Sequence, residues 1–180
     1  MIQVDFDLGD GMRIRSLDPG DADALFALVE ANRERLRPWM PWEATTRSAD
    51  DIRDFIERSR ASSSDAEGNG IWVDGELAGT IGMSIDTLSN SAEIGYWIDA
   101  AHEGRGIVTR GCRRLVEEAF GALGIHRVSL RAATGNARSQ AVAERLGMRR
   151  EGVLRDAERV HDGYHDIVVF SILEHEWRSP

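Results

Sequence analysis

The sequence predicts one domain with a mixed α/β fold of the α+β class, in which about seven strands form one sheet and about four helices cover its faces. Three observations support this prediction. A chain of 180 residues has the length of a single domain, which we place over residues 1–180. The spacing of its apolar residues changes along the chain from a helical period to a period of two and back. The dipeptides Asp74-Gly75 and Asp162-Gly163 are typical of two-residue hairpin turns.

The N-terminal third of the chain predicts one strand and two helices. Residues 12–17 alternate between two faces, which is typical of a short strand. Residues 22–36 and 50–60 both carry apolar side chains at helical spacing. The prolines within residues 37–42 end the first helix, and Ser48 is placed to cap the second.

The rest of the chain predicts a sheet with two further helices. Residues 62–68 have the composition of a loop, and we expect them to be mobile. Period-two spacing predicts four strands and a final hairpin, at residues 70–73, 77–85, 93–98, 127–132 and on both sides of residues 162–163. Helical spacing predicts two helices, each followed by a glycine that suits a C-terminal cap: residues 106–123 before Gly124 and residues 139–146 before Gly147. This order of elements indicates a mixed sheet with helices on its faces.

The composition excludes several classes of function. All 22 basic residues are arginine, so a phosphate-binding loop with its lysine, the strand lysine of kinases and Schiff-base catalysis are excluded. A net charge of −9 argues against direct binding of nucleic acid, whose recognition depends on neutralised phosphates. The single cysteine, Cys112, excludes an intrachain disulfide framework, and we expect it to be packed in the core.

Nothing in the sequence indicates a membrane protein. The chain lacks a run of about 18 apolar residues, as a membrane-spanning helix requires. Its first ten residues carry three aspartates where a signal peptide needs positive charge. We therefore expect a cytoplasmic protein without membrane contact.

A glycine-rich turn follows the predicted strand at residues 93–98 and opens a long helix. Its core is Gly104-Arg105-Gly106, and the first amides of the helix lack partners within it. Glycine permits close approach of the backbone, so this turn suits a pyrophosphate, although a plain strand-to-helix turn would look the same. A dinucleotide site fails on two counts, because Thr109 replaces its third glycine and residues 124–126 contain no acidic side chain.

Several ordered motifs resemble the GNAT superfamily of acyl-CoA-dependent N-acetyltransferases. These motifs are EIGYW at residues 93–97, GRGI at 104–107, NARSQAVAERLGM at 136–148, EGVL at 151–154 and PWMPW at 38–42. Together they resemble the branch that acetylates the N-terminal serine or alanine of ribosomal proteins, and the likeness covers nearly the whole chain. The resemblance implies the GNAT fold, with a mostly antiparallel sheet.

The resemblance also implies that the chain binds acetyl-CoA, and it indicates which residues would do so. The strand at residues 93–98 should part from its parallel neighbour near Trp97 and leave main-chain amides free for the thioester carbonyl and the pantetheine arm. Asn136 would hydrogen-bond the amide arm, although turn formation explains an asparagine there equally well. The residues implied in coenzyme A binding are Trp97, Ile98, Gly104, Arg105, Gly106, Ile107, Val108, Thr109, Asn136 and Ser139.

The sequence departs from the superfamily pattern at three positions. Glu103 stands where the phosphate motif usually has glutamine or arginine, and we expect it to point to solvent, away from the phosphates. Val108 is bulkier than the usual last residue of that motif. Ala143 replaces the tyrosine that protonates the departing thiolate in many members, and alanine has no proton to give.

Two catalytic roles follow from the resemblance. Ser139 is placed by motif to donate to the thiolate, although a serine near Asn136 also suits helix capping. Glu158 is expected to be the base, with Glu93 as its competitor. Each glutamate could equally form an ion pair, with Arg155 or Arg159 among the candidates.

The acceptor amine should lie beside the loop at residues 37–42. We expect Trp39, Trp42 and Tyr96 to contribute to its binding, although burial would explain the tryptophans as well. His161 and His165 flank the second hairpin turn, where their spacing does not suit a metal, and we expect no metal site.

Acetyl transfer to a protein or peptide N-terminal α-amine, with a ribosomal-protein N-terminus as acceptor, is the leading functional hypothesis. One alternative is a small amine as acceptor: an aminoglycoside, a polyamine or an amino-nucleotide. The other is a non-catalytic acyl-CoA-binding module, which Ala143 and Glu103 keep open. A homodimer fits the resemblance.

Overall fold

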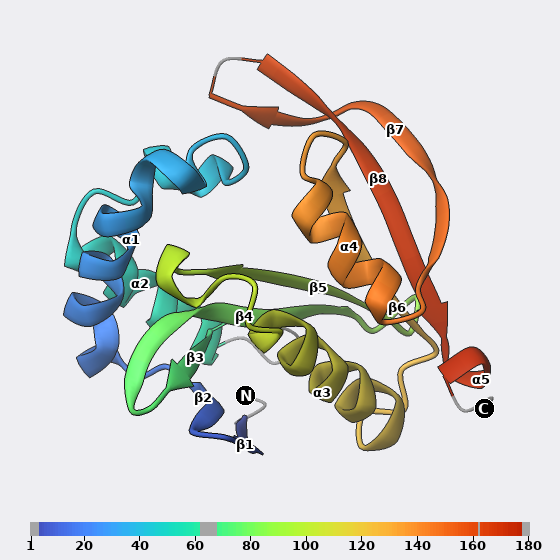
Figure 1. Ribbon diagram of the computed structural model, residues 1–180, viewed down its shortest axis with the longest axis horizontal. Helices are drawn as coiled ribbons and strands as arrows, with labels where there is room; N and C mark the ends of the chain where they lie inside the picture. The colour runs from blue at the N-terminus through green and yellow to red at the C-terminus, as the bar shows by residue number, and fades with distance from the viewer. Residues whose placement is uncertain (1–3, 62–67, 162, 178–180) are drawn as a thin grey trace.

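The computed structural model describes residues 4–61, 68–161 and 163–177, and its centre is an eight-stranded sheet with helices on both faces (Figure 1). The strand order is β1-β2-β3-β4-β5-β6-β8-β7, in which β5 and β6 run parallel and the other neighbours antiparallel. The strands are β1 (Asp5–Gly9), β2 (Met12–Ser16), β3 (Asn69–Val73), β4 (Glu76–Asp86), β5 (Ser91–Ile98), β6 (Arg127–Ala133), β7 (Arg149–Val160) and β8 (Gly163–Leu173). The predicted loop at residues 62–68 lies outside the described residues except for Gly68, and so does Asp162 of the second predicted turn.

The four predicted helices are confirmed with small shifts of their ends. They are α1 (Ala22–Leu36), α2 (Ala49–Ala61), α3 (Ile107–Gly121) and α4 (Ala137–Arg145). A single further turn, α5 (Glu174–Trp177), and three short 3-10 turns, η1 (Pro19–Asp21), η2 (Pro41–Ala44) and η3 (Ala100–His102), complete the set. The Ser48 hydroxyl accepts a hydrogen bond from the Asp51 amide at 3.2 Å, so it caps α2 as predicted.

The first strand, β1, was not predicted. Phe6 and Leu8 alternate with polar residues over β1, but the segment is short and acidic. Its pairing with β2 depends on a tight turn in which Gly9, Asp10 and Gly11 all have positive φ angles, of 74°, 51° and 72°. The sheet therefore gains one edge strand over the predicted number.

Two apolar clusters lie on opposite faces of the sheet. On one face, α1 and α2 pack over a cluster that includes Trp97 of β5. On the other face, α3 and α4 pack over the larger cluster, which includes Ile94 and the fully buried Cys112. A side chain at Gly111 would press on Ile81 at 3.0 Å, so glycine lets α3 lie close to the sheet.

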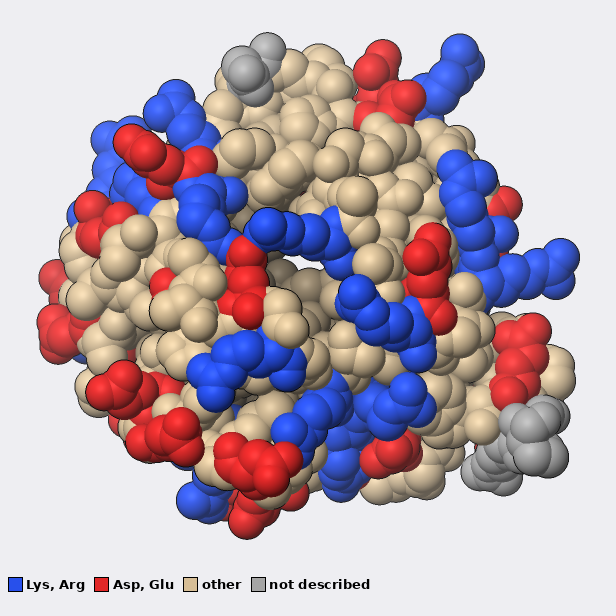
Figure 2. All heavy atoms as spheres, in the orientation of Figure 1, with Lys and Arg blue, Asp and Glu red and all other residues tan. Residues whose placement is uncertain are grey.

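The parallel pair β5 and β6 separates after four residue pairs. Residues 91–94 of β5 pair with residues 127–130 of β6, and β5 continues to Ile98 without further pairing to β6. The separation expected near Trp97 is therefore present and begins at Gly95. This parting divides the molecule into two halves, one containing strands β1 to β5 and the other containing strands β6 to β8. In Figure 2 the face of the molecule is hollowed at its centre, and arginine side chains gather at the rim of this central cleft.

Candidate active site

The glycine-rich turn closes the end of β5 and opens α3 in the geometry that an anion site needs. Gly104 and Gly106 have positive φ angles of 72° and 73°, which side chains rarely adopt. A Cβ atom at either position would meet nothing within 4 Å, so the space in front of the turn is open. Gly106 is also the N-cap of α3 and has no side chain to cap it. The amides of Ile107, Val108 and Thr109 are therefore available at the positive end of a 15-residue helix.

Glu103 does not point to solvent, and that prediction is wrong. Its carboxylate is half-buried and lies between two arginines, with Arg35 of α1 on one oxygen and Arg138 of α4 on the other. This triad links the two sides of the cleft beside the glycine turn. Two positive side chains are thus held beside the glycine turn, with the negative charge of Glu103 between them.

Trp97 and Ile98 reach the cleft through their backbone. The Trp97 side chain is buried, 6% exposed, and its ring centroid lies 6.3 Å from that of Trp42. Both residues pair with β4 on one side, and on the other side β5 has already parted from β6. The role expected of them in cofactor binding stays a prediction that rests on this free strand edge.

Asn136 caps α4, and Ser139 does not. The Asn136 side chain accepts a hydrogen bond from the Ser139 amide at 3.1 Å, so α4 begins before the predicted helix at residues 139–146. Ser139 sits in the first turn of α4, half exposed, with its hydroxyl free of any capping role. The alternative of a capping serine is thereby removed, and Ser139 keeps its predicted catalytic role as a prediction.

Tyr96 meets Ser139 across the parted strands. The Tyr96 and Ser139 hydroxyl oxygens lie 2.9 Å apart, and the Tyr96 hydroxyl also lies 3.4 Å from the Ser139 carbonyl oxygen. Alternation along β5 places Tyr96 on the face of α3 and α4, whereas Trp97 lies on the face of α1 and α2. Tyr96 was expected to contact only the acceptor. It is a direct neighbour of Ser139, the predicted hydrogen-bond donor to the thiolate.

Glu93 and Glu158 lie close enough to interact electrostatically. Glu93 keeps contact with solvent, but the protein around it reduces its hydration, and this burial raises the pKa of its carboxyl. Arg131 opposes the rise in pKa, and the negative charge of Glu158 adds to it. Within the described residues, neither glutamate forms an ion pair with Arg155 or Arg159.

A β-bulge lies directly before Glu158 on β7. The pairing of β7 with β8 shifts register between Leu154 and Glu158, and Asp156 in the bulge has a positive φ of 49°. The Asp156 amide donates to Asp166 Oδ1 at 2.9 Å, which holds the bulge in place. Bulges of this kind re-aim side chains beside functional sites, and no local sequence pattern predicts this one.

The loop between α1 and α2 touches the β7–β8 hairpin. The ring centroids of Trp39 and His165 lie 6.2 Å apart, edge to face. His161 Nε2 lies 3.2 Å from Glu43 Oε2, and Glu43 also accepts from Arg33 Nη1 at 2.5 Å. Glu43, 5% exposed, was not predicted, since only the fold brings it to the hairpin. The α1–α2 loop and the β7–β8 hairpin are thus held together by an aromatic contact and an ion pair.

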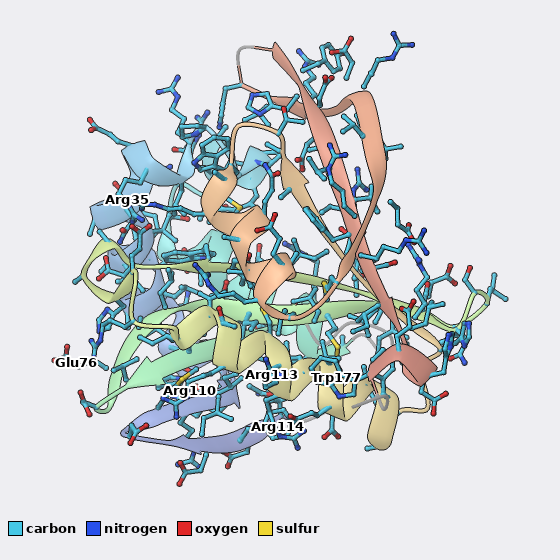
Figure 3. All side chains as sticks on the ribbon, turned by 45° about the vertical axis from the view of Figure 1, so that its right-hand side comes forward. Arg35, Glu76, Arg110, Arg113, Arg114 and Trp177 are labelled. Carbon is cyan, nitrogen blue, oxygen red and sulfur yellow. The ribbon has the colours of Figure 1, made fainter. Side chains whose placement is uncertain are left out.

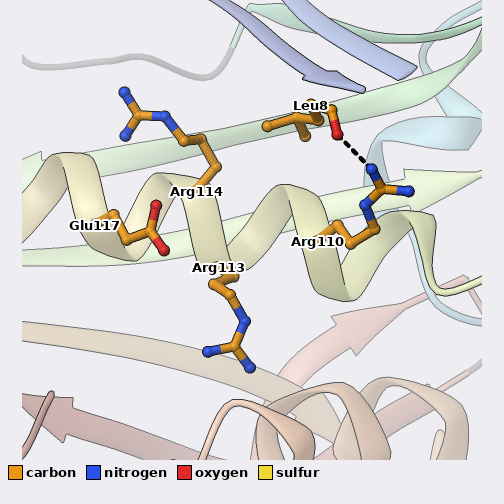
Figure 4. A pocket seen from close by; sticks show the side chains of 5 residues that line it. All are labelled: Leu8, Arg110, Arg113, Arg114 and Glu117. Carbon is orange, nitrogen blue, oxygen red and sulfur yellow. Dashed lines mark hydrogen bonds between the residues drawn. The ribbon is translucent and has the colours of Figure 1, made fainter. Parts of the chain in front are cut away.

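A separate cavity of about 200 Å³ lies on the outer face of α3, and none of the residues that line it is a predicted site residue. It is lined by Leu8, Arg110, Arg113, Arg114 and Glu117 (Figure 4). Arg110 donates to the Leu8 carbonyl (Figure 4). The guanidinium carbon of Arg113 lies 5.5 Å from the ring centroid of Trp177 (Figure 3). That of Arg114 lies 3.8 Å from the ring centroid of Phe6. These arginines fasten β1 and α5 to α3, so they have structural partners already.

The described part of the chain holds no cluster of three or more histidine, cysteine, aspartate or glutamate residues that could bind a metal. No helix among the described residues has the length and apolar character needed to span a bilayer.

The parted strands, the open glycine turn and the uncapped helix fit a long thioester cofactor with a diphosphate. The open space at Gly104 and Gly106 accommodates the phosphates, and the free edge of β5 offers amides to an extended amide chain. Fold and site thus define an acyl-CoA-dependent transferase. The sequence model of the acetyltransferase (GNAT) domain matches residues 12–149, and the chain belongs to this family. It is an acetyl-CoA-dependent N-acetyltransferase.

Two bacterial relatives are similar over most of the chain. "Putative ribosomal N-acetyltransferase YdaF" of Bacillus subtilis is 41% identical over 170 residues, 92% of this chain and 93% of the relative. The ribosomal-protein-serine acetyltransferase of Escherichia coli is 26% identical over 167 residues, 91% of this chain and 93% of the relative.

Solved structures agree with the fold. A crystal structure named "Probable acetyltransferase" superposes with a TM-score of 0.91 at 38% identity, covering 97% of this chain and 99% of the other. The microcin C7 self-immunity acetyltransferase MccE, solved with acetyl-CoA and AMP, superposes with a TM-score of 0.86 at 28% identity, covering 92% of this chain and 94% of the other.

Proposed function

We propose that this acetyltransferase acts on the N-terminal α-amine of a protein or peptide, with a ribosomal protein as the leading acceptor. The observation that carries the proposal is the similarity, over 92% and 91% of the chain, to two relatives that are named for ribosomal-protein acetylation. The proposal covers residues 1–180 as one N-acetyltransferase domain.

The electrostatics of the cleft support an α-amine. Such an amine has a pKa of about 8 and is partly neutral at physiological pH, so a moderate base suffices. Glu158 is the proposed base, and Glu93, with its raised pKa, is the second candidate. The two carboxylates also suit the positive charge of an approaching ammonium group.

We propose that main-chain amides and side-chain hydroxyls bind and orient acetyl-CoA. Acetyl-CoA supplies the activated acetyl group as a thioester. The amides of residues 104–109 and the Arg105 side chain would bind the diphosphate, with Asn136 and the backbone of Trp97 and Ile98 along the arm. Ser139 Oγ would donate a hydrogen bond to the leaving sulfur.

The acceptor side is proposed to consist of Trp39, Trp42 and Tyr96, with the tryptophans on the loop that meets the hairpin. We also propose a cytoplasmic location, a homodimer, and no direct contact with nucleic acid or membrane. The net charge of −9 supports the absence of nucleic-acid binding.

To test the proposal, the purified protein is incubated with acetyl-CoA and with peptides that begin with serine, alanine or other residues. The release of free coenzyme A thiol measures turnover. The same panel contains peptides blocked at the N-terminus but carrying a lysine, and a set of small amines. Turnover with free serine or alanine N-termini supports the proposal. Turnover restricted to small amines, or to lysine side chains, overturns it.

A nucleotide-linked amine is the second candidate acceptor, and one finding favours it. The MccE structure, 28% identical, contains AMP beside acetyl-CoA. An amino-acyl adenylate analogue in the panel distinguishes this acceptor from a peptide.

A further inference from the structure

The contact between Tyr96 and Ser139 joins β5 to α4 in the region where β5 has parted from β6. Tyr96 lies on β5 beyond its last pair with β6, and Ser139 lies in the first turn of α4. Their hydroxyl oxygens are 2.9 Å apart. Ala143, one turn further along α4, is fully buried and has no hydroxyl. The phenol that lies near Ser139 is therefore that of Tyr96 on β5.

The direction of this hydrogen bond follows from chemistry. A phenol is a far stronger acid than an aliphatic alcohol, so Tyr96 is the better donor and Ser139 Oγ the better acceptor. The Ser139 amide is already bonded to the Asn136 side chain, which fixes the start of α4. The Tyr96 hydroxyl can also donate to the Ser139 carbonyl oxygen at 3.4 Å, but its contact with Ser139 Oγ is shorter, at 2.9 Å. We therefore take Tyr96 as the donor to Ser139 Oγ, which leaves the Ser139 proton for a third partner.

We infer that Tyr96 is a positioning residue for the leaving-group step: by donating to Ser139 Oγ, its hydroxyl turns the Ser139 proton toward the sulfur of coenzyme A. This inference rests on the role proposed above for Ser139. Burial raises the pKa of Tyr96, so the phenol stays protonated and remains a donor throughout the working range of pH.

The chemistry balances without ionising either hydroxyl. The amine nitrogen forms a bond to the acetyl carbon, the carbon–sulfur bond breaks, and its electron pair stays on sulfur. The Ser139 hydroxyl donates a hydrogen bond to that sulfur, polarised by the bond it accepts from Tyr96. The proton that the amine loses passes to a carboxylate and then to solvent, which also protonates the released thiolate.

The decisive experiment is a double-mutant cycle with Tyr96→Phe, Ser139→Ala and the combined variant. Tyr164→Phe is the matched control, because the chain has two tyrosines and Tyr164 is 62% exposed on β8. We expect Tyr96→Phe to lower kcat about three- to tenfold, the effect of one neutral hydrogen bond, with little change in KM for acetyl-CoA. In the Ser139→Ala background the same change should have no further effect.

A second readout needs no acceptor. Coenzyme A bound to each variant is titrated, and the ultraviolet absorbance of its thiolate gives the ionisation constant of the bound thiol. Tyr96→Phe and Ser139→Ala should both weaken thiol ionisation, Tyr96→Phe about three- to tenfold, while Tyr164→Phe leaves it unchanged. This titration stays valid even if the proposed peptide acceptor is wrong, so the two failures are distinguishable.

Two results overturn the inference. Independent effects of the two substitutions on kcat would show that Tyr96 does not act through Ser139. A loss of thermal stability or of coenzyme A affinity in Tyr96→Phe, with unchanged thiol ionisation, would show that the contact only ties α4 to β5.

Discussion

At the scale of single residues, Glu93 and Glu158 interact electrostatically, and substituting each in turn shows which of them is the base. We predict that Glu158→Gln lowers kcat/KM at neutral pH about 100-fold and more than Glu93→Gln does, because a positioned base contributes that much. The negative charge of Glu158 helps to raise the pKa of Glu93, so Glu158→Gln should also lower the pKa of Glu93. Rates with an N-terminal peptide, measured from acidic to neutral pH, test both statements.

The control for the carboxylates is Glu117→Gln, on the outer face of α3. Since a base accepts a proton only as the ionised carboxylate, acidification should lower the activity of the parent enzyme. Equal rates for Glu158→Gln and the parent would remove Glu158 as the base. A larger loss in Glu93→Gln would assign that role to Glu93.

Gly106 offers a second prediction at this scale. Gly106→Ala places a Cβ in the open space before the glycine turn and strains a backbone with φ of 73°. Gly147→Ala imposes the same strain at φ of 74°, also into open space, but beyond the end of α4. Both variants should lose stability by about 1 kcal/mol. Calorimetric titration with coenzyme A should then show weaker binding for Gly106→Ala alone, and equal binding of both variants would contradict the phosphate role of this turn.

At the scale of elements, Glu151 ties the edge strand β7 to its neighbour β8 and to β6 beyond it. Its carboxylate accepts two bonds from Arg127 of β6, both at 2.7 Å, and one from Ser171 of β8 at 2.6 Å. The bonds from Arg127, followed by the bond from Ser171, lower the pKa of Glu151 from 4.5 to about 2. A lowered pKa in the folded state means that the stabilisation is present above the unfolded value of 4.5 and is lost as the pH falls toward about 2.

We therefore predict that Glu151→Gln destabilises the protein at neutral pH and that the difference from the parent vanishes near the lowered pKa. The side chain is 40% exposed, so solvent screening limits the loss to about 1 kcal/mol. Urea unfolding at several pH values measures it, with Glu57→Gln on the exposed side of α2 as the control. A difference that persists unchanged into strongly acidic solution would contradict this assignment.

The helices and the first hairpin could be predicted from the sequence, whereas the bulge and the contacts across the cleft could not. Periodicity and caps were sufficient for the four helices, and the hairpin at Asp74-Gly75 has the positive φ angles, 53° and 87°, that its sequence predicts. The bulge before Glu158 has no such signature, because it depends on a side chain of the partner strand, Asp166. The pairs Tyr96–Ser139 and Glu43–His161 join residues distant in the chain, and local patterns carry no information on such contacts.

At the scale of the whole molecule, two bridges cross the cleft. The triad of Arg35, Glu103 and Arg138 links α1 to α4 beside the glycine turn, and Glu43–His161 links the α1–α2 loop to the β7–β8 hairpin. The first bridge holds a negative charge next to the proposed diphosphate site. Removing that charge should therefore release both arginines for the cofactor.

We predict that Glu103→Gln tightens coenzyme A binding about two- to fivefold at low salt, the range of effects seen for partly exposed ion pairs. The gain should shrink as salt is added, because added ions screen the same charges. Glu34→Gln, an exposed neighbour on α1, controls for the change in net charge. Weaker binding in Glu103→Gln would mean that the bridge preorganises the cleft instead.

The four residue pairs between β5 and β6 divide the sheet along the order of the chain. Strands β1 to β5 precede the short link at residues 122–126, and strands β6 to β8 follow it, so neither half borrows a strand from the other. Every antiparallel pairing lies within one half, including the long-range pairs β2–β3 and β6–β8, so only the four parallel pairs between β5 and β6 join the two halves of the sheet. A chain cut within that link keeps every antiparallel ladder intact, and co-expressed fragments should recombine into the native molecule.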